Sequence, residues 1–174
     1  MFDYTMEHLC SYTATLRQPF EVLGETPAGL RLNAYVTGGE VSGPRLRGRL
    51  LPVGGDWLTV RRDGVGLLDV RATIETHDGA LIYVEYQGVL ELGVDGYKRL
   101  LSGTAPLQAP IQAAPRLLTA HPDYLWVNRL QCVNVGMADF ATSSVSYDVY
   151  AVRANDARPS TDPPVQPSTW PTKM

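Results

Sequence analysis

An Asp-Gly pair at residues 78 and 79 separates two segments rich in β-branched and aromatic residues, and it constrains the fold more than any other feature. The flanking segments, residues 67–76 and 81–92, have the composition of β-strands, and Asp-Gly between two such strands is a strong hairpin signal. If Asp78 and Gly79 alone form the turn, His77 pairs with Ala80 and Arg71 pairs with Tyr86.

This register determines which side chains share a face of the hairpin, because successive residues of a strand point to opposite sides. One face then carries Asp69, Arg71, Thr73 and Glu75 beside Ile82, Val84, Tyr86 and Gly88. The other face carries Leu68, Val70, Ala72 and Ile74 beside Tyr83, Glu85, Gln87 and Val89. Neither face is plainly polar, so the pattern alone does not say which of them meets solvent.

The rest of the chain favours more strands and no long helix. Residues 30–36 alternate clearly between apolar and polar, and residues 7–16, 41–51, 56–62, 125–135 and 143–153 also resemble strands. Asp63-Gly64 and Asp95-Gly96 add further turns. Residues 98–123 contain four prolines without a sustained period, so we expect a long Pro-rich loop there. These features predict an all-β, antiparallel barrel or sandwich of about eight strands.

The composition is that of a protein with one folded domain. A chain of 174 residues can bury a substantial core, and we assign residues 1–153 to one β domain. Residues 154–174 are proline-rich and polar, and are expected to form an extended tail. The net charge of −3 indicates no nucleic-acid surface, and the apolar runs are too short to span a membrane. With no secretory signal visible and two cysteines interpreted as reduced core thiols, we expect a cytoplasmic protein.

An ordered run of short motifs resembles a known family of bacterial and fungal proteins, domain of unknown function family 3237. The run lies in residues 38–88 and comprises Gly39, Gly43-Pro44-Arg45-Leu46, Gly48, Gly55-Asp56-Trp57, Asp63-Gly64, Leu68-Asp69-Val70-Arg71, Asp78-Gly79-Ala80, Ile82, Tyr86 and Gly88. A weaker match resumes at residues 124–128, and residues 115–119 depart from the family pattern. The resemblance implies a compact, lipocalin-like antiparallel β-barrel that is often oligomeric. It implies no settled activity.

The family-like residues of the hairpin, among them Asp69, Arg71, Tyr86 and Gly88, share one face under the expected register. If that face points into a barrel, a guanidinium, a carboxylate and a phenol meet aliphatic walls, which is the composition of a small-molecule pocket. Gly88 would leave room for a ligand or for a strand bend. The alternative is that Arg71 pairs with Asp69 or Asp56 only to neutralise buried charge.

Four residues outside the hairpin are further candidates for the site. Asp56 and Trp57 follow a glycine turn, where Asp56 is either a general acid or base or only a turn cap. Trp126 and Asn128 are two residues apart and either line a pocket or pack in the core. The scattered histidines give no metal-ligand spacing, and no nucleotide or dinucleotide fingerprint occurs, so neither a metal nor a cofactor is expected.

We therefore hypothesise an enzyme that needs no cofactor and transfers protons on a small hydrophobic or aromatic substrate, as a lyase, isomerase or cyclase. Arg71 would hold an oxyanion, Tyr86 would donate or accept a proton, and Asp56 or Asp69 would act as base or orient Arg71. Trp57, Trp126, Asn128 and Gly88 would bind substrate. The alternatives are a carrier or sensor of a small hydrophobic ligand and a structural oligomerisation module.

The same register has a consequence for the outer surface. Leu68, Val70, Ile74, Tyr83 and Val89 would point outward and form a patch too apolar for a soluble monomer. We expect residues 98–123 or a second copy of the chain to cover this patch, which favours a homo-oligomer.

Overall fold

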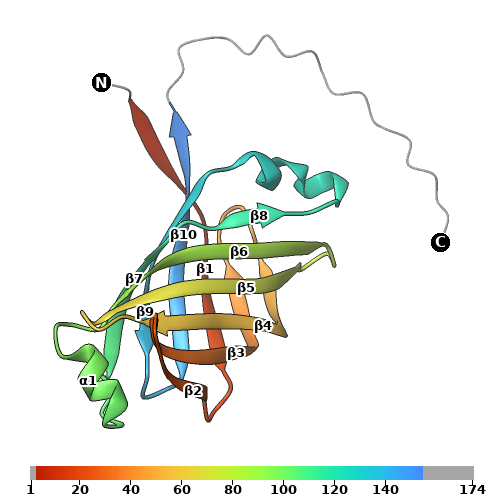
Figure 1. Ribbon diagram of the computed structural model, residues 1–174. Coiled ribbons are helices and arrows are strands. Elements are labelled where there is room, and N and C mark those ends of the chain that lie inside the picture. Colours follow the sequence, from red (N-terminus) through yellow and green to blue (C-terminus); the bar gives the residue numbers. More distant parts are fainter. Residues whose placement is uncertain (1–2, 155–174) are drawn as a thin grey trace.

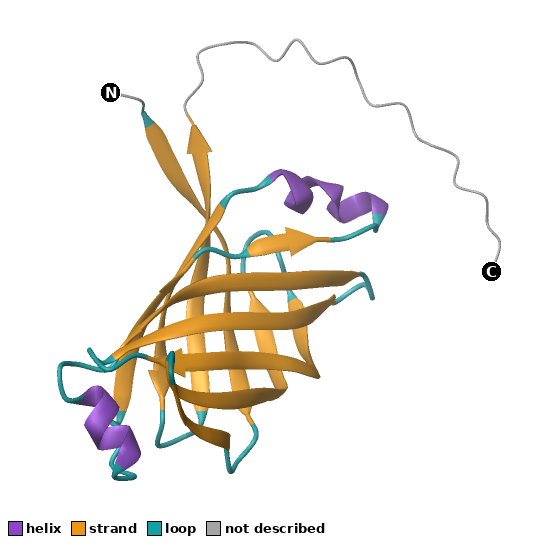
Figure 2. Ribbon diagram, in the orientation of Figure 1, coloured by secondary structure: helices purple, strands orange, loops and turns teal. Residues whose placement is uncertain are grey.

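The computed structural model describes residues 3–154 and is built almost entirely of antiparallel strands (Figures 1 and 2). In chain order the elements are β1 (Tyr4–Leu16), β2 (Glu21–Thr26), β3 (Gly29–Ser42), β4 (Gly48–Val60), β5 (Val65–Thr76), β6 (Leu81–Glu91), α1 (Gly96–Leu101), β7 (Gln108–Ala113), β8 (Arg116–Leu118), the 3₁₀ segment η1 (Pro122–Arg129), β9 (Cys132–Asp139) and β10 (Ser144–Ala154). None of the helices in this range is long and apolar enough to cross a membrane. The expected proline-rich tail falls largely on residues 155–174, outside the described part.

Strand β1 closes the sheet into a barrel. It pairs with β10 over most of its length and, from Ser11 to Leu16, also with β3. The pairing therefore runs β3–β4–β5–β6–β7–β9–β10–β1 and back to β3, and β2 and β8 are added at the margins of β3 and β6. The prediction of an antiparallel barrel of about eight strands is confirmed.

The turn between β5 and β6 contains three residues rather than two. The Thr76 N–H donates to the Ala80 carbonyl at 2.8 Å, and the Gly79 N–H donates to the Thr76 carbonyl at 2.9 Å. His77, Asp78 and Gly79 thus form the loop, and Gly79 adopts the left-handed conformation (φ +88°) that such three-residue loops require. The expected register is wrong by one residue.

The extra loop residue moves the charged hairpin face to the outside. Arg71 pairs with Glu85, and Val70 pairs with Tyr86. The buried hairpin residues include Leu68, Val70, Ala72, Ile74, Ile82, Val84 and Tyr86. The placement of Tyr86 inside the barrel was right, but the placement of Asp69 and Arg71 there was wrong.

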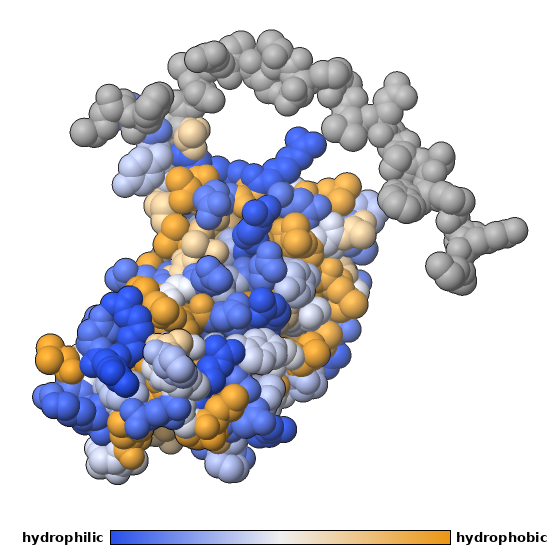
Figure 3. All heavy atoms as spheres, viewed as in Figure 1, coloured by the Kyte–Doolittle hydropathy of each residue, from blue (hydrophilic) through white to orange (hydrophobic). Residues whose placement is uncertain are grey.

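The apolar outer patch expected on the hairpin is for the most part the inner wall of the barrel. Leu68, Val70 and Ile74 belong to the core, and of the expected outward residues Val89 is exposed and Tyr83 half-buried. Hydrophilic and hydrophobic residues are interspersed over the face drawn in Figure 3. Homo-oligomerisation stays a prediction, without the buried patch as its reason.

The proline-bearing segment is more regular than its sequence indicates, because it contains the end of α1 together with β7 and β8. Proline has no N–H to donate and is tolerated in a strand where one neighbour is absent. Pro110 meets this condition, because β6 pairs only with Ile111–Ala113 and β9 is the one strand paired with β7 at Pro110. The strand expected at residues 125–135 starts only at Cys132. The residues before it form η1, which the Tyr124 hydroxyl ties to Asp78 in the β5–β6 turn at 3.0 Å.

A substitution at Gly88 can test how closely β6 packs against β7. A methyl group at Gly88 would collide with the Gln112 carbonyl and Ala113 of β7. Gly88→Ala is therefore expected to lower the free energy of unfolding by about 1–3 kcal/mol, measured by chemical denaturation. Gln87→Ala, a change at the exposed neighbour, should alter it by less than about 0.5 kcal/mol. A Gly88→Ala protein of unchanged stability would contradict this role of the glycine.

Candidate functional site

The barrel encloses a cavity of about 70 Å³, room for roughly five water molecules. Its wall is made of aliphatic and aromatic side chains from most of the barrel strands. The polar side chains among them are Asp56, Tyr12, Tyr86 and Tyr147, and Asp56 is the one that ionises near neutral pH. An apolar cavity with a few fixed polar groups is the usual form of a small-molecule site.

The cavity opens at one end of the barrel. Its half-buried apolar wall residues come from the end of β1, the link to β2, and the β9–β10 turn: Leu16, Phe20, Phe140 and Val145. These segments are held together, since the Leu16 N–H donates to the Ser143 carbonyl at 2.9 Å. In Figure 1 this end lies at the bottom of the barrel, opposite the paired ends of β1 and β10. A ligand would enter past this apolar rim.

The strand register places the Asp56 side chain on the inner face of the barrel. It pairs with Ala34 on β3 and Val70 on β5, which both line the cavity, and directly paired residues share a face. Just before it, the β4–β5 pairing shifts between Leu50 and Gly54, a type of irregularity that often lies beside functional sites. The Asp69 N–H donates to Asp56 Oδ1 at 2.9 Å. Burial dominates over this hydrogen bond and raises the pKa of Asp56 to about 7.

Three tyrosines from three strands meet across the barrel. The Tyr12 hydroxyl donates to the Tyr86 hydroxyl at 3.3 Å, and the Tyr147 ring lies 5.1 Å from the Tyr12 ring and 5.8 Å from the Tyr86 ring, centroid to centroid. Burial raises the pKa of all three phenols. They therefore act as neutral hydrogen-bonding groups at pH 7 rather than as bases.

Asn134 supports this tyrosine layer from β9. The side chain is fully buried, and its Nδ2 donates to the Tyr12 hydroxyl at 3.3 Å. Its Oδ1 has no hydrogen-bond partner among the described residues. Asn134 also borders a void of about 10 Å³, the size of one water molecule. Beyond this layer the barrel is filled by side chains such as Leu9, Leu46 and Ile82. The tyrosine layer is thus the floor of the cavity.

Arg71 and Asp69 form an ion pair on the outside of the barrel. Arg71 Nη1 donates to Asp69 Oδ1 at 2.9 Å, and both side chains are exposed. The Arg71 guanidinium also lies 5.5 Å from the centre of the Trp57 ring. With Glu85, Gln87 and Arg116, the pair lines an open depression of about 380 Å³. The four residues proposed as catalytic are therefore divided, with Asp56 and Tyr86 inside and Asp69 and Arg71 outside.

The remaining sequence-predicted binding residues lie away from the interior cavity. The Arg45 guanidinium lies over the ring of Trp126 on η1, 4.7 Å from the ring centroid. Asn128 is exposed and binds the backbone of Thr119: its Oδ1 accepts the Thr119 N–H at 2.8 Å, and its Nδ2 donates to the Thr119 carbonyl at 2.9 Å. Gly88 packs against β7. Trp57 lies beside Arg71 on the outer surface. Tyr12, Tyr147 and Asn134, which line or support the cavity, were not among the predicted site residues.

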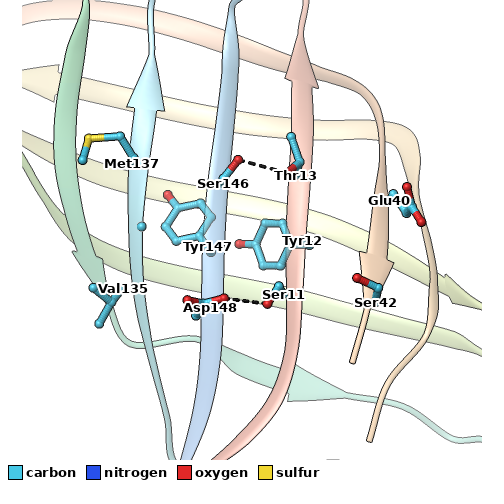
Figure 4. Close-up of a pocket in the computed structure, with 11 residues that line it drawn as sticks. Ser11, Tyr12, Thr13, Glu40, Ser42, Val135, Met137, Ser146, Tyr147 and Asp148 are labelled. Carbon is cyan, nitrogen blue, oxygen red and sulfur yellow. Dashed lines mark hydrogen bonds between the residues drawn. The ribbon is translucent and has the colours of Figure 1, made fainter. Parts of the chain in front are cut away.

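A second outer depression, of about 490 Å³, lies over β1, β9 and β10 (Figure 4). The Ser and Thr hydroxyl groups on β1 and β10 are paired with neighbours: Thr13 with Ser146 at 2.9 Å, and Ser11 with Asp148 at 2.5 Å. His8 Nε2 lies 3.2 Å from the Ser11 hydroxyl and 3.9 Å from the Asp148 carboxylate. Ser11 donates to the carboxylate rather than to the imidazole, so this trio lacks the arrangement that activates a nucleophile.

The structure also locates the two cysteines and the groups that could bind a metal. Cys10 and Cys132 are free and buried, and burial raises the pKa of their thiols to about 12 and about 11. They are therefore protonated at neutral pH and poor nucleophiles. Within residues 3–154, no group of three or more His, Cys, Asp or Glu side chains is arranged to hold a metal ion.

Together these features define a closed antiparallel β-barrel with an interior cavity that opens at one end. The chain belongs to the family described as protein of unknown function (DUF3237), whose model matches residues 4–152. A UPF0311 protein from Rhodopseudomonas palustris is 34% identical over 74% of this chain and 84% of its own length. A UPF0311 protein from Clostridium acetobutylicum is 31% identical over 72% and 80%, respectively.

Solved structures share the whole fold. A beta-barrel like protein from Acinetobacter baumannii is 30% identical, with a TM-score of 0.74 over 87% of this chain and 97% of that chain. A conserved protein of unknown function from R. palustris is 28% identical, with a TM-score of 0.76 over 87% and 99%. An enzyme from Penicillium herquei, 20% identical, has a TM-score of 0.58 over 86% and 95%, which is a likeness of fold alone.

The raised pKa of Asp56 predicts a specific dependence of stability on pH. An acid whose pKa is higher in the folded than in the unfolded state stabilises the fold at low pH, and this contribution is lost as pH rises toward the folded pKa. Between about pH 4 and pH 8 the wild type should lose on the order of 3 kcal/mol of unfolding free energy relative to Asp56→Asn, measured by denaturant titration. Glu85→Gln, on the outer surface, should follow the wild type. If the free energy of unfolding depended on pH in the same way for the wild type and Asp56→Asn, this would contradict the raised pKa of Asp56.

Proposed function

We propose that the protein binds a small, mostly apolar molecule in the interior cavity and transfers protons on it without a cofactor. The observation that carries this proposal is a carboxyl group with a pKa of about 7 facing an apolar cavity beside neutral phenols. A group with this pKa is available both as acid and as base at neutral pH, which suits general acid–base catalysis. The reaction classes that need no more than this are those of lyases, isomerases and cyclases.

The roles proposed for single residues follow from their positions. Asp56 transfers the proton, and the Tyr86 and Tyr147 hydroxyls orient the ligand. Arg71 holds no oxyanion in this scheme, because its side chain is on the outer surface. The rim formed by Leu16, Phe20, Phe140 and Val145 admits the apolar part of the ligand. The small cavity volume favours either a compact ligand or the insertion of one end of a larger molecule.

A non-catalytic carrier is the second candidate function, and one observation favours it. The Tyr12 and Tyr86 hydroxyls and the Asn134 amide already bond to one another, so most interior polar groups are satisfied without a ligand. In a carrier, Asp56 would serve for recognition alone. Binding without proton transfer separates this function from the enzyme.

Deuterium exchange of a ketone tests the enzymatic proposal directly. The Asp56 carboxylic acid should donate its hydrogen to the carbonyl oxygen of cyclopentanone while a water molecule takes an α-hydrogen. Reversal of this step in D₂O replaces the α-hydrogens by deuterium, which NMR follows. Asp56→Asn keeps a hydrogen-bonding amide but cannot transfer a proton, so it should bind cyclopentanone and lower the exchange rate by about 10²-fold or more. Tyr86→Phe should weaken binding. Binding without exchange in the wild type would favour the carrier.

Two further variants decide between the interior and the outer surface. Ala34→Leu places a larger side chain beside Asp56 and should abolish cyclopentanone binding, and Ala34→Val is the milder change if leucine prevents folding. Gln87→Leu on the outer depression should leave binding unchanged. Arg71→Ala should also retain binding and exchange. Loss of both in Arg71→Ala, in a folded protein, would move the site to the outer surface and contradict the interior proposal.

A further inference from the structure

Asp56 has one carboxyl oxygen bonded and the other free to meet a ligand. Oδ1 accepts the Asp69 N–H, and Oδ2 makes no hydrogen bond to any residue of the described range. The side chains that flank Asp56 on β3 and β5 are Ala34 and Val70, which offer no polar atom. Asp56 is half-buried and lines the cavity, so its free oxygen can meet a ligand there.

The charged groups near Asp56 do not supply a cation inside the barrel. Arg31 on β3 lowers the pKa of Asp56, but its side chain is bonded to Thr59 at 2.9 Å. Asp69 on β5 raises the pKa and is paired with Arg71 on the outer surface. The ionisable groups that face Asp56 from β1, β6 and β10 are the phenols of Tyr12, Tyr86 and Tyr147, which are neutral at pH 7.

This balance of charge restricts the ligand. A carboxylate or phosphate in the cavity would lie beside Asp56 in an apolar space without a counter-ion, which is strongly unfavourable. An uncharged ligand meets no such penalty if Asp56 is protonated. The carboxylic acid then carries one O–H donor, and an oxygen acceptor on the ligand can replace the water that this donor gives up when the ligand fills the cavity.

From this geometry we infer that the cavity rejects anionic ligands and takes uncharged ones with an oxygen acceptor, such as a ketone, and that Asp56 binds them as a carboxylic acid donating its hydrogen to that oxygen. The inference rests on the proposed function, since it specifies the ligand class and the protonation state of the same cavity. It assigns Asp56 the donor role, with Tyr86 and Tyr147 as neutral neighbours.

Ligand binding must then be coupled to proton uptake. A ligand that displaces water from the cavity removes the remaining hydration of Asp56, which favours the protonated form further. If the acid form alone binds, the association constant of cyclopentanone should fall about 30-fold between pH 6 and pH 8.5, given the pKa of about 7. Isothermal titration calorimetry in two buffers of different ionisation enthalpy should record proton uptake near pH 7.5.

The first experiment compares two small probes by NMR titration of the wild type at about pH 6. Cyclopentanone is uncharged and accepts a hydrogen bond, and butyrate is an anion of similar size. Cyclopentanone should shift the resonances of cavity residues such as Tyr86 and Ala138, and butyrate should bind at least tenfold more weakly. Equal affinities for the two probes would overturn the inference.

The second experiment assigns the pH dependence to one residue. Asp56→Asn keeps an N–H donor but does not titrate, so its affinity for cyclopentanone should be the same at pH 6 and pH 8.5. Glu85→Gln, which removes a half-buried carboxylate from the outer depression, should retain the wild-type dependence. A wild type whose cyclopentanone binding does not change with pH, or an Asp56→Asn protein with an unaltered dependence, would refute the donor role.

The outcomes also separate this inference from the proposed function. Binding of cyclopentanone inside the barrel without pH dependence would refute the donor role alone and leave the interior site intact. Binding in Ala34→Leu equal to that of the wild type, or no shift of any cavity resonance, would refute both.

Discussion

The closure of the sheet by β1 is the constraint on which the rest of the structure depends. Because β1 pairs with β3 on one side and β10 on the other, each barrel strand has neighbours on both sides, and its side chains alternate between a sealed interior and the outer surface. In such a barrel a shift of one residue exchanges the two environments for an entire strand. The strand register therefore decides whether an ionisable side chain lies inside the barrel. Asp56 lies inside because it pairs with the inward-facing Ala34 and Val70.

The sequence was sufficient to predict the barrel class, the hairpin around Asp78-Gly79, and an inward Tyr86, because hydrophobic alternation and turn chemistry are local signals. It was not sufficient for the register. A two-residue and a three-residue loop both suit His77-Asp78-Gly79, and the hydrogen bonds of Thr76 to Ala80 that distinguish them form only in the folded hairpin. Strands β7 and β8 were hidden by prolines, which are tolerated where a neighbouring strand is absent.

The tyrosine layer was missed for a related physical reason. Tyr12 and Tyr147 are adjacent partners on β1 and β10, but the contact of Tyr12 with Tyr86 crosses the barrel, and its hydrogen bond with Asn134 joins residues far apart in the chain. The alternation of Val145, Tyr147 and Val149 indicates a common face, yet only closure shows that this face meets β6. Asp56 was recognised from an expected turn at Gly54-Gly55, which the structure replaces by an irregularity inside β4. Its separation from Arg71 depends on the hairpin register.

The tyrosine layer at the floor of the cavity also determines how a ligand can enter and leave the barrel. Since the space beyond it is filled, the opening beside Phe20 and Phe140 has to serve as both entrance and exit. Under the proposed enzymatic function, a product has to leave before the next molecule enters, and water expelled by an arriving molecule has to pass along its sides. Two separate reactants would have to share one narrow chamber. Reactions within a single molecule, in which a bond forms, breaks or shifts without a second organic partner, match a dead-end chamber of this kind best.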